Sequence, residues 1–352
     1  MFPKNLKYLR LKANMTKKEL AQRAQVSQMA ISHYENGNRK PSMEIIYRLA
    51  EALDVRPVEF LHARNDKLCF VHGDFRKRST LSMGKQEYVR EEAETYFNRF
   101  FSIIDVLGDL VLVQNPPMNI LFLVEDDEAN ARKLREHLGF PPDGPLGAVI
   151  GSLENNGILV YQFDANNEKF DGMTGTVEGH PYIIVNGMMT TERQRSTIAH
   201  ELAHMFFVWP GDMEQADIER RAMSIAGAFL FPKQDVIREL GIRRRYITND
   251  MIMVAQEYGI SLQLLVMRAK ICGVISEEAH TAFRKKVSSL GWTKNEPSRI
   301  AIEVPTLLTQ LVYRAVNEQE ISIQKGAELL QTSYEDVAKN CSFNLANASH
   351  LQ

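Results

Sequence analysis

The segment TIAHELAHMFF, residues 197–207, places two histidines four positions apart in an apolar stretch. Its pattern predicts a helix over about 192–208. On such a helix His200 and His204 face the same side, with Cβ atoms about 5–6 Å apart. Two imidazoles at that separation can bind one zinc ion, and Glu201 can accept a proton from water beside the metal. This stretch therefore predicts a zinc site with its own base.

A third ligand is expected from the next predicted helix, ADIERRAMSIAGAFLFP, which ends at Pro232. The apolar positions of this helix turn Glu219 toward the core. An inward carboxylate is costly unless it is paired or bound to a metal, so Glu219 is the predicted third ligand. Asp212, Glu214 and Asp217 compete for the role. The first two lie in a predicted loop, and Asp217 faces another direction.

Short β-like runs precede the motif helix. GILVYQF (157–163) and PYIIVNG (181–187) are apolar and rich in β-branched residues, which predicts two strands. Residues 165–180, which join them, are predicted to be turn. An edge strand beside an active-site helix can bind an extended peptide by adding it to the sheet, and residues 182–186 are predicted to take that place.

Residues 5–61 follow a different pattern, which predicts five short helices. Thr16 is expected to cap the second helix in a capping box with Glu19, while Ser27 and Ser42 cap later helices. A tight turn across 24–27 joins two helices in the geometry that seats the second one in the major groove. The predicted core of this module consists of Leu6, Leu9, Leu20, Ala24, Val26, Ile31, Ile45, Leu49, Leu53 and Leu61.

The charge of this module favours a polyanionic partner. Residues 1–64 contain twelve Lys and Arg against six Asp and Glu, a net charge of +6, although the whole chain carries −2. Gln28 can pair bidentately with adenine. The residues predicted to read bases are Ser27, Gln28, Met29, Ser32 and His33, and those predicted to contact phosphates are Lys17, Asn38, Arg39 and Lys40.

Two resemblances follow from these motifs. The order T-K-K-E-L-A-Q-R-A-x-V-S-Q-M-A-I-S-H-Y-E-N-G-N-R-K-P-S within residues 5–61 resembles the Cro/phage-repressor (Xre-type) helix-turn-helix family, which implies binding to double-stranded operator DNA. Residues 183–232 resemble the ImmA/IrrE family of zinc metallopeptidases. The matching pieces are I-x-V-N, R-x-R-S-T-I-A-H-E-L-A-H and I-E-R-x-A-x-x-I-A-G-A-F-L-F-P.

The second resemblance implies that Zn²⁺ is bound by His200, His204 and Glu219, with Glu201 as the general base. The sequence departs from the family pattern at one position that bears on these roles. Arg221 stands where a second glutamate is common, which leaves position 221 open as the family's ligand site. The other departures are Ser196, Met223 and Ile225, and they concern how a substrate fits.

Composition argues against a membrane protein, a secreted protein and a disulfide-rich protein. Hydrophobic residues make up 44% of the 352 residues and charged residues 24%, as in ordinary globular proteins. No apolar run approaches the roughly 18 residues of a transmembrane helix, and the N-terminus lacks the pattern of a secretory signal. Cys69, Cys272 and Cys341 are far apart and form no pairing pattern. We therefore expect a cytoplasmic protein without a membrane partner.

We predict a mixed, mainly α chain in four parts. Residues 1–64 form the five-helix helix-turn-helix domain, and 65–145 a linker and helical connector. Residues 146–240 form an α+β, zincin-like peptidase core with a small sheet, and 241–352 a helical C-terminal region. Within this region a structural role is expected for residues 246–276, and packing or dimerisation for 301–340.

The predicted function is a DNA-binding transcriptional regulator with a zinc-dependent endopeptidase domain. Its expected substrate is a protein, either a repressor or antitoxin-like regulator or the chain itself, cut within 62–80. The alternative is a non-proteolytic repressor whose peptidase-like body senses a signal or pairs subunits. A homodimer is expected because helix-turn-helix modules usually bind paired half-sites.

Overall fold

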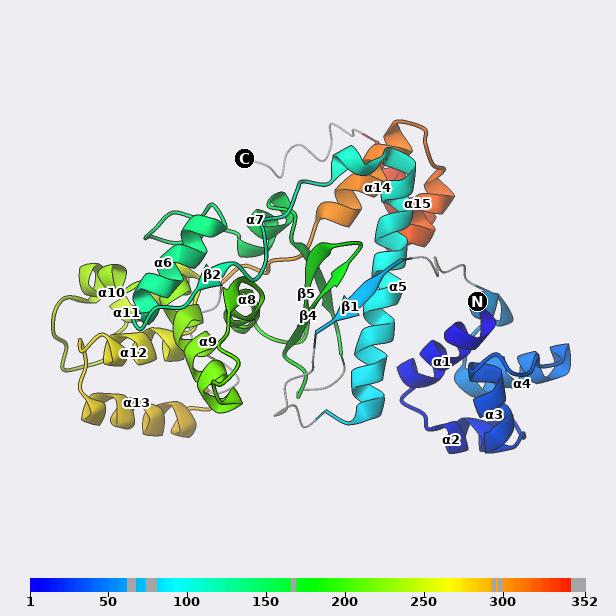
Figure 1. Cartoon of the computed structure of the whole chain (residues 1–352), viewed down its shortest axis with the longest axis horizontal. Helices are drawn as coiled ribbons and strands as arrows, with labels where there is room; N and C mark the ends of the chain where they lie inside the picture. The colour runs from blue at the N-terminus through cyan, green and yellow to red at the C-terminus, as the bar shows by residue number, and fades with distance from the viewer. Residues whose placement is uncertain (62–67, 74–80, 166–168, 293–295, 297–299, 343–352) are drawn as a thin grey trace. The chain divides into compact units, whose positions relative to one another are not determined.

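The computed structural model describes residues 1–61, 68–73, 81–165, 169–292, 296 and 300–342 (Figure 1). The chain divides into two compact units, Met1–Asp109 with Leu311–Gln352, and Leu110–Gln310. The described residues form sixteen α-helices and a small mixed sheet, which confirms the predicted mainly α fold class. No described helix combines the length and the apolar character needed to cross a membrane.

The first unit begins with a small helical bundle. The caps predicted from sequence form: Thr16 and Glu19 make both hydrogen bonds of a capping box, and the Ser27 and Ser42 hydroxyls accept backbone N–H groups of the helices that they precede. Its elements are α1 (Phe2–Lys12), α2 (Lys17–Arg23), α3 (Gln28–Glu35), α4 (Met43–Leu53) and the 3₁₀ helix η1 (Pro57–Leu61).

Most of the predicted core of this bundle is buried, with one error at its end. Leu61 is 63% exposed, whereas its neighbour Phe60 is fully buried and contacts Phe2. The last segment is a 3₁₀ helix, whose three-residue turn directs Phe60 inward and Leu61 to solvent. Tyr8 and Tyr34 also join this core.

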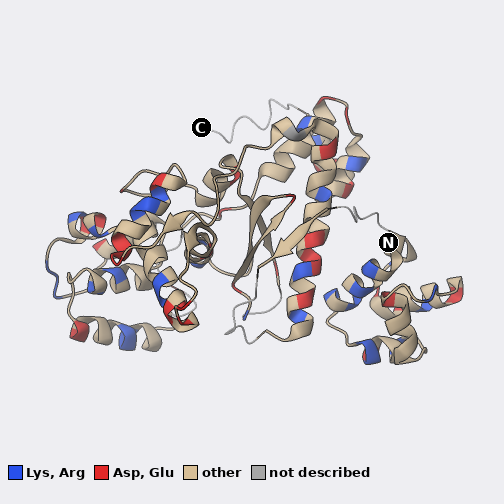
Figure 2. Ribbon diagram, viewed as in Figure 1, with Lys and Arg blue, Asp and Glu red and all other residues tan. Residues whose placement is uncertain are grey.

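The rest of the first unit is helical apart from one short strand. In α5 a stripe of apolar residues that includes Phe97 and Ile104 is buried, while acidic and basic residues follow one another along the helix (Figure 2). Arg99 of α5 donates to the backbone oxygen of Leu329, 2.7 Å away. The elements are β1 (Phe70–His72), α5 (Met83–Leu107), α15 (Ile323–Leu330) and α16 (Tyr334–Cys341). Two more, η2 (Asp109–Val111) and α14 (Leu307–Asn317), contain the residues at which the two units are divided.

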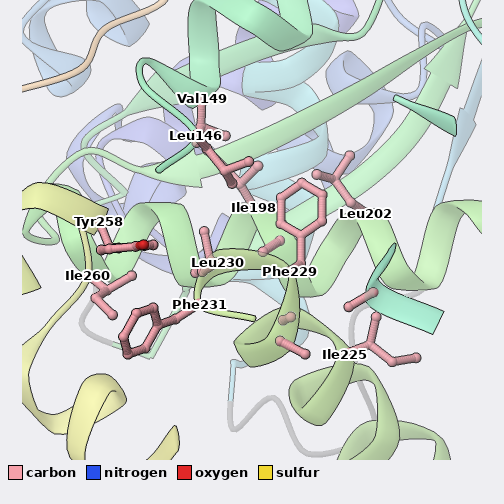
Figure 3. Close-up of a cluster of buried hydrophobic side chains, with 14 of the residues drawn as sticks. Leu146, Val149, Ile198, Leu202, Ile225, Phe229, Leu230, Phe231, Tyr258 and Ile260 are labelled. Atoms are coloured by element: carbon pink, nitrogen blue, oxygen red, sulfur yellow. The ribbon is translucent and has the colours of Figure 1, made fainter. Parts of the chain in front are cut away.

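The second unit has one large apolar core built around two helices, α8 and α9. Ile198 and Leu202 of α8 face the ring of Phe229 of α9, and all three are fully buried (Figure 3). Burial of this surface fixes the two helices side by side. The helices of this unit are α6 (Asp127–His137), α7 (Val149–Asn155), α8 (Thr191–Phe206), α9 (Gln215–Leu230), α10 (Lys233–Leu240), α11 (Asp250–Tyr258), α12 (Leu262–Ile271) and α13 (Glu277–Ser289).

The strands of this unit correct two predictions. β5 (His180–Asn186) pairs in parallel with β3 (Leu159–Phe163) and antiparallel with β4 (Gly172–Val177). The prediction that residues 182–186 form an edge strand is therefore wrong, because β5 has a partner on each side. The prediction that 165–180 is all turn is also wrong, because β4 lies within it.

The missed strand has a physical explanation in its glycines. Gly172 lies so close to α8 that a Cβ atom there would be 2.7 Å from Cγ2 of Thr197 and 3.0 Å from the Ile184 oxygen. Glycine lacks strand propensity but allows this approach. Glu178 and Gly179, with φ of 50° and 80°, form the two-residue turn into β5, as in a type I′ hairpin.

The motif helix also ends two residues earlier than predicted. It stops at Phe206 because β6 (Phe207–Val208) pairs in parallel with β2 (Leu121–Phe122), a segment distant in sequence. The C-terminal helices of the unit pack on its large apolar core, although Ile271, which was predicted to pack with them, is 55% exposed. Leu262, Leu265 and Val266 of α12 are buried in the same core as α8 and α9, which supports a structural role for residues 246–276.

Candidate metal centre and nucleic-acid interface

Three side chains from α8 and α9 converge on one point of the second unit. The Nε2 atoms of His200 and His204 are 2.9 Å apart. The Glu219 carboxylate lies 3.4 Å from Nε2 of His200 and 3.5 Å from Nε2 of His204. Among the described residues, these form the group of His, Cys, Asp and Glu side chains that could hold a metal, with all ligand atoms within 4.8 Å of one another.

The donor set suits a zinc ion. Tetrahedral bonds of about 2.0–2.1 Å place neighbouring ligand atoms roughly 3.3 Å apart, close to the 3.4 and 3.5 Å between the histidines and Glu219. Two imidazoles and one carboxylate are also the three protein ligands of one known class of catalytic zinc site, which keeps a fourth position open. The side chain of His200 is 2% exposed and that of His204 20%, so the group is open on the His204 side.

The surroundings orient Glu219. Gln215, one turn earlier on α9, donates from Nε2 to Oε1 of Glu219 at 3.0 Å. Hydrogen bonds of this kind fix the direction of a ligating carboxylate. The Trp209 ring lies 5.6 Å from the ring of His204. Sequence reasoning missed both residues, although the four-residue spacing of Gln215 and Glu219 could have identified the first.

Arg221 is directed elsewhere. Its Nη2 and Nε atoms donate to Asp127 at 2.8 and 3.1 Å, and Nη2 also donates to the oxygen of Val124. The guanidinium therefore holds the start of α6 and supplies no ligand. Of the acidic competitors, Asp217 pairs with Arg220 at 2.7 Å, and neither Asp212 nor Glu214 belongs to the described group.

Glu201 lies next to His200 and is only 6% exposed. Strand β4 passes beside it, since a Cβ atom at Gly172 would be 3.8 Å from Cγ of Glu201. The Glu201 side chain is therefore buried, with its Cγ beside strand β4.

In the first unit, the predicted base-reading residues lie on the exposed side of α3. Ser27, Gln28, Met29 and His33 are exposed, and Met29 reaches 69%. Ser32 is half-buried, and Lys17 of α2 lies 3.4 Å from its hydroxyl.

The predicted phosphate contacts divide into two kinds. Asn38, Arg39 and Lys40 are exposed just beyond α3. Lys17 instead lies 3.4 Å from Glu35, which also pairs with Arg10 at 2.5 Å. Lys17 therefore links α2 to α3, and it also adds positive charge near the exposed residues of α3.

Two family models match the chain, one in each unit. Residues 6–60 match the family model of the helix-turn-helix, and residues 153–270 match that of the IrrE N-terminal-like domain, a peptidase family. The chain joins a helix-turn-helix domain to an IrrE-like peptidase domain. The predicted fusion is confirmed, and none of the curated proteins searched matches the chain.

Two carboxylates, Glu154 and Glu303, join the segment 303–307, which follows α13, to the rest of the second unit. Arg195 of α8 is 6% exposed and pairs with Glu303 at 2.6 Å. Burial lowers the pKa of Arg195, and the neighbouring Glu303 opposes this. Glu303 also accepts the N–H of Ile150, and Glu154 accepts those of Thr306 and Leu307.

Replacing Glu303 with glutamine is expected to lower the free energy of unfolding of this unit by about 1.5–3 kcal/mol, since a hydrogen-bonded buried charge is lost with little change of shape. Urea unfolding followed by the fluorescence of Trp209 and Trp292, which both lie in this unit, measures the change. Glu318→Gln is the matched control, because its pair with Arg314 is half-exposed and contributes at most about 0.5 kcal/mol. Equal urea midpoints of unfolding for the two variants would show that the Glu303 contacts do not stabilise this unit.

Proposed function

We propose that this protein is a DNA-binding transcriptional regulator that cleaves a protein through a zinc-dependent peptidase site. The observation that carries the proposal is the convergence of His200, His204 and Glu219. Glu201, which follows His200 on α8, is buried. The proposed substrate is a repressor or antitoxin-like regulator, or the chain itself. Most of the proposed self-cleavage segment, 62–67 and 74–80, lies outside the described residues.

The proposed roles follow from the donor types. His200, His204 and Glu219 would hold zinc, which when bound supplies Lewis acidity that polarises a carbonyl and makes water acidic near neutral pH. Glu201 takes a proton from the attacking water as the new C–O bond forms at the peptide carbonyl. It then gives the proton to the amine nitrogen as the C–N bond breaks. Gln215 keeps Glu219 in position.

The proposed partner of the first unit is a double-stranded operator in the cytoplasm, bound by a homodimer. Exposed residues of α3 support this, because a recognition helix reads base edges with its first turns and outer face. The proposed domain boundaries remain 1–64, 65–145, 146–240 and 241–352. They separate the DNA-binding role from the peptidase role.

Removal of metal should separate the two roles. Treatment with 1,10-phenanthroline is expected to abolish cleavage of a proteome-derived peptide library, and added zinc is expected to restore it, because the three ligands hold a removable ion. DNA affinity should not change. The isomer 1,7-phenanthroline, which cannot chelate, is the control. Cleavage that continues without metal would contradict the zinc mechanism, and absence of any cleavage with zinc bound would favour a non-proteolytic repressor.

Two variants should distinguish base reading from phosphate contact. Gln28→Ala is expected to cost about 1–3 kcal/mol on the preferred site and to relax selectivity at one base pair. Arg39→Ala should weaken binding to all sequences alike and reduce the salt-dependence slope by about 1. Selection from random DNA supplies the site, and fluorescence anisotropy at several salt concentrations measures both effects. The same salt slope and selectivity in both variants would contradict these roles.

A further inference from the structure

A second concave site lies in the second unit, away from the three metal-binding side chains. It is a pocket of about 230 Å³ between the segment 245–249 and helices α11, α12 and α13. None of its lining residues belongs to the group of His200, His204 and Glu219. The proposed peptidase mechanism does not use this pocket.

The inner part of the pocket is apolar. Leu262 and Phe283 are 1% and 6% exposed and belong to the main core of the unit, and Ile252 packs against that core. Trp292 and Tyr246 add aromatic surface at the wall. Pockets of this composition bind small molecules by burying a ring or an alkyl chain. The volume suits a ligand with one ring.

The charged side chains that line the pocket are all positive. Its charged lining residues are Arg245 and Lys286, and no Asp or Glu lines it. Both side chains are exposed, and neither has an ion pair with another described residue. Asp250, next to the lining residue Asn249, is held by Arg244, which lowers the pKa of Asp250 to about 2. The two cations therefore favour an anion at the mouth of an apolar pocket.

We propose that this pocket binds a small amphipathic carboxylate. The ring or short alkyl chain would lie against Phe283, Trp292 and Ile252, and the carboxylate would accept charge-assisted hydrogen bonds from Arg245 and Lys286. The Arg guanidinium presents two donors that match a carboxylate, and Lys adds a point charge. This inference is independent of zinc and of proteolysis, because none of these residues takes part in either.

The probes are 3-phenylpropionate and octanoate, with 3-phenylpropionamide as a neutral analogue of the first. Isothermal titration calorimetry on the full chain should show saturable binding of both carboxylates, with an affinity at least about ten-fold above that of the amide. The chain contains two tryptophans, so in Trp209→Phe the remaining fluorescence comes from Trp292. That fluorescence should change with the same dissociation constant, because Trp292 lines the pocket.

Arg245→Ala and Lys286→Ala should each weaken carboxylate binding about ten-fold and leave amide binding unchanged. Arg284→Ala removes an exposed cation of α13 outside the lining and should have no effect. Ala282→Phe places a ring at the exposed mouth of the pocket and should abolish binding. Absence of saturable carboxylate binding, equal affinity for the amide, or unchanged binding in Ala282→Phe would each overturn the proposal.

Discussion

Glu201→Gln is expected to lower the rate of peptide cleavage by about 100- to 10,000-fold, with bound zinc at the wild-type level. Glutamine has the shape of glutamate, so the buried site beside α8 and Gly172 can accept it. It cannot accept a proton from water at neutral pH. Because Glu201 is not one of the three converging donors, its loss should not weaken the metal site.

The measurement begins with a proteome-derived peptide library, from which mass spectrometry identifies a cleaved peptide. The ratio kcat/KM for that peptide is then compared between wild type and variant. Glu214→Gln is the matched control, since Glu214 is exposed and lies outside the metal-binding group, and it should stay within about three-fold of wild type. A Glu201→Gln protein that cleaves at the wild-type rate would exclude Glu201 as the base.

His204→Ala and Glu219→Ala are each expected to weaken zinc binding more than about 100-fold. Losses of 10- to 100-fold follow from changes to residues that only support a ligand, and loss of a ligand should exceed them. Both side chains lie within 3.5 Å of each other at the point where the donors converge. Competition against a chromogenic chelator measures the affinity.

Two variants on α9 serve as controls for this experiment. Asp217→Ala removes a carboxylate that pairs with Arg220, and Arg221→Ala removes a cation that holds Asp127. Both should bind zinc with nearly wild-type affinity, because neither side chain reaches the converging donors. Full zinc affinity in Glu219→Ala, together with a loss in Asp217→Ala, would show that another carboxylate is the ligand.

Local features were predictable from the sequence because their causes are local. The Thr16 capping box and the Ser27 and Ser42 caps depend on a few neighbouring residues, and the structure has them where they were predicted. The shared face of His200 and His204 follows in the same way from helix periodicity. The inward direction of Glu219 followed from the apolar face of a single helix.

Features that depend on distant contacts were missed. Strand β4 contains Gly172 and Gly175, which do not favour strands, and it forms because it pairs with β5 and passes close to α8. The end of α8 at Phe206 depends on pairing between β2 and β6. Likewise, the contact of Trp209 with His204 requires the loop after α8 to fold back, which no local pattern encodes.

The most direct test of the account is the metal content of the full chain. Inductively coupled plasma mass spectrometry should find about one zinc per chain in the wild type, after reconstitution and removal of free metal, and far less in His204→Ala under the same treatment. This result would identify the point where His200, His204 and Glu219 converge as a zinc site. A wild-type protein that binds DNA but retains no zinc would contradict the account and leave α8 as a structural helix of a DNA-binding regulator.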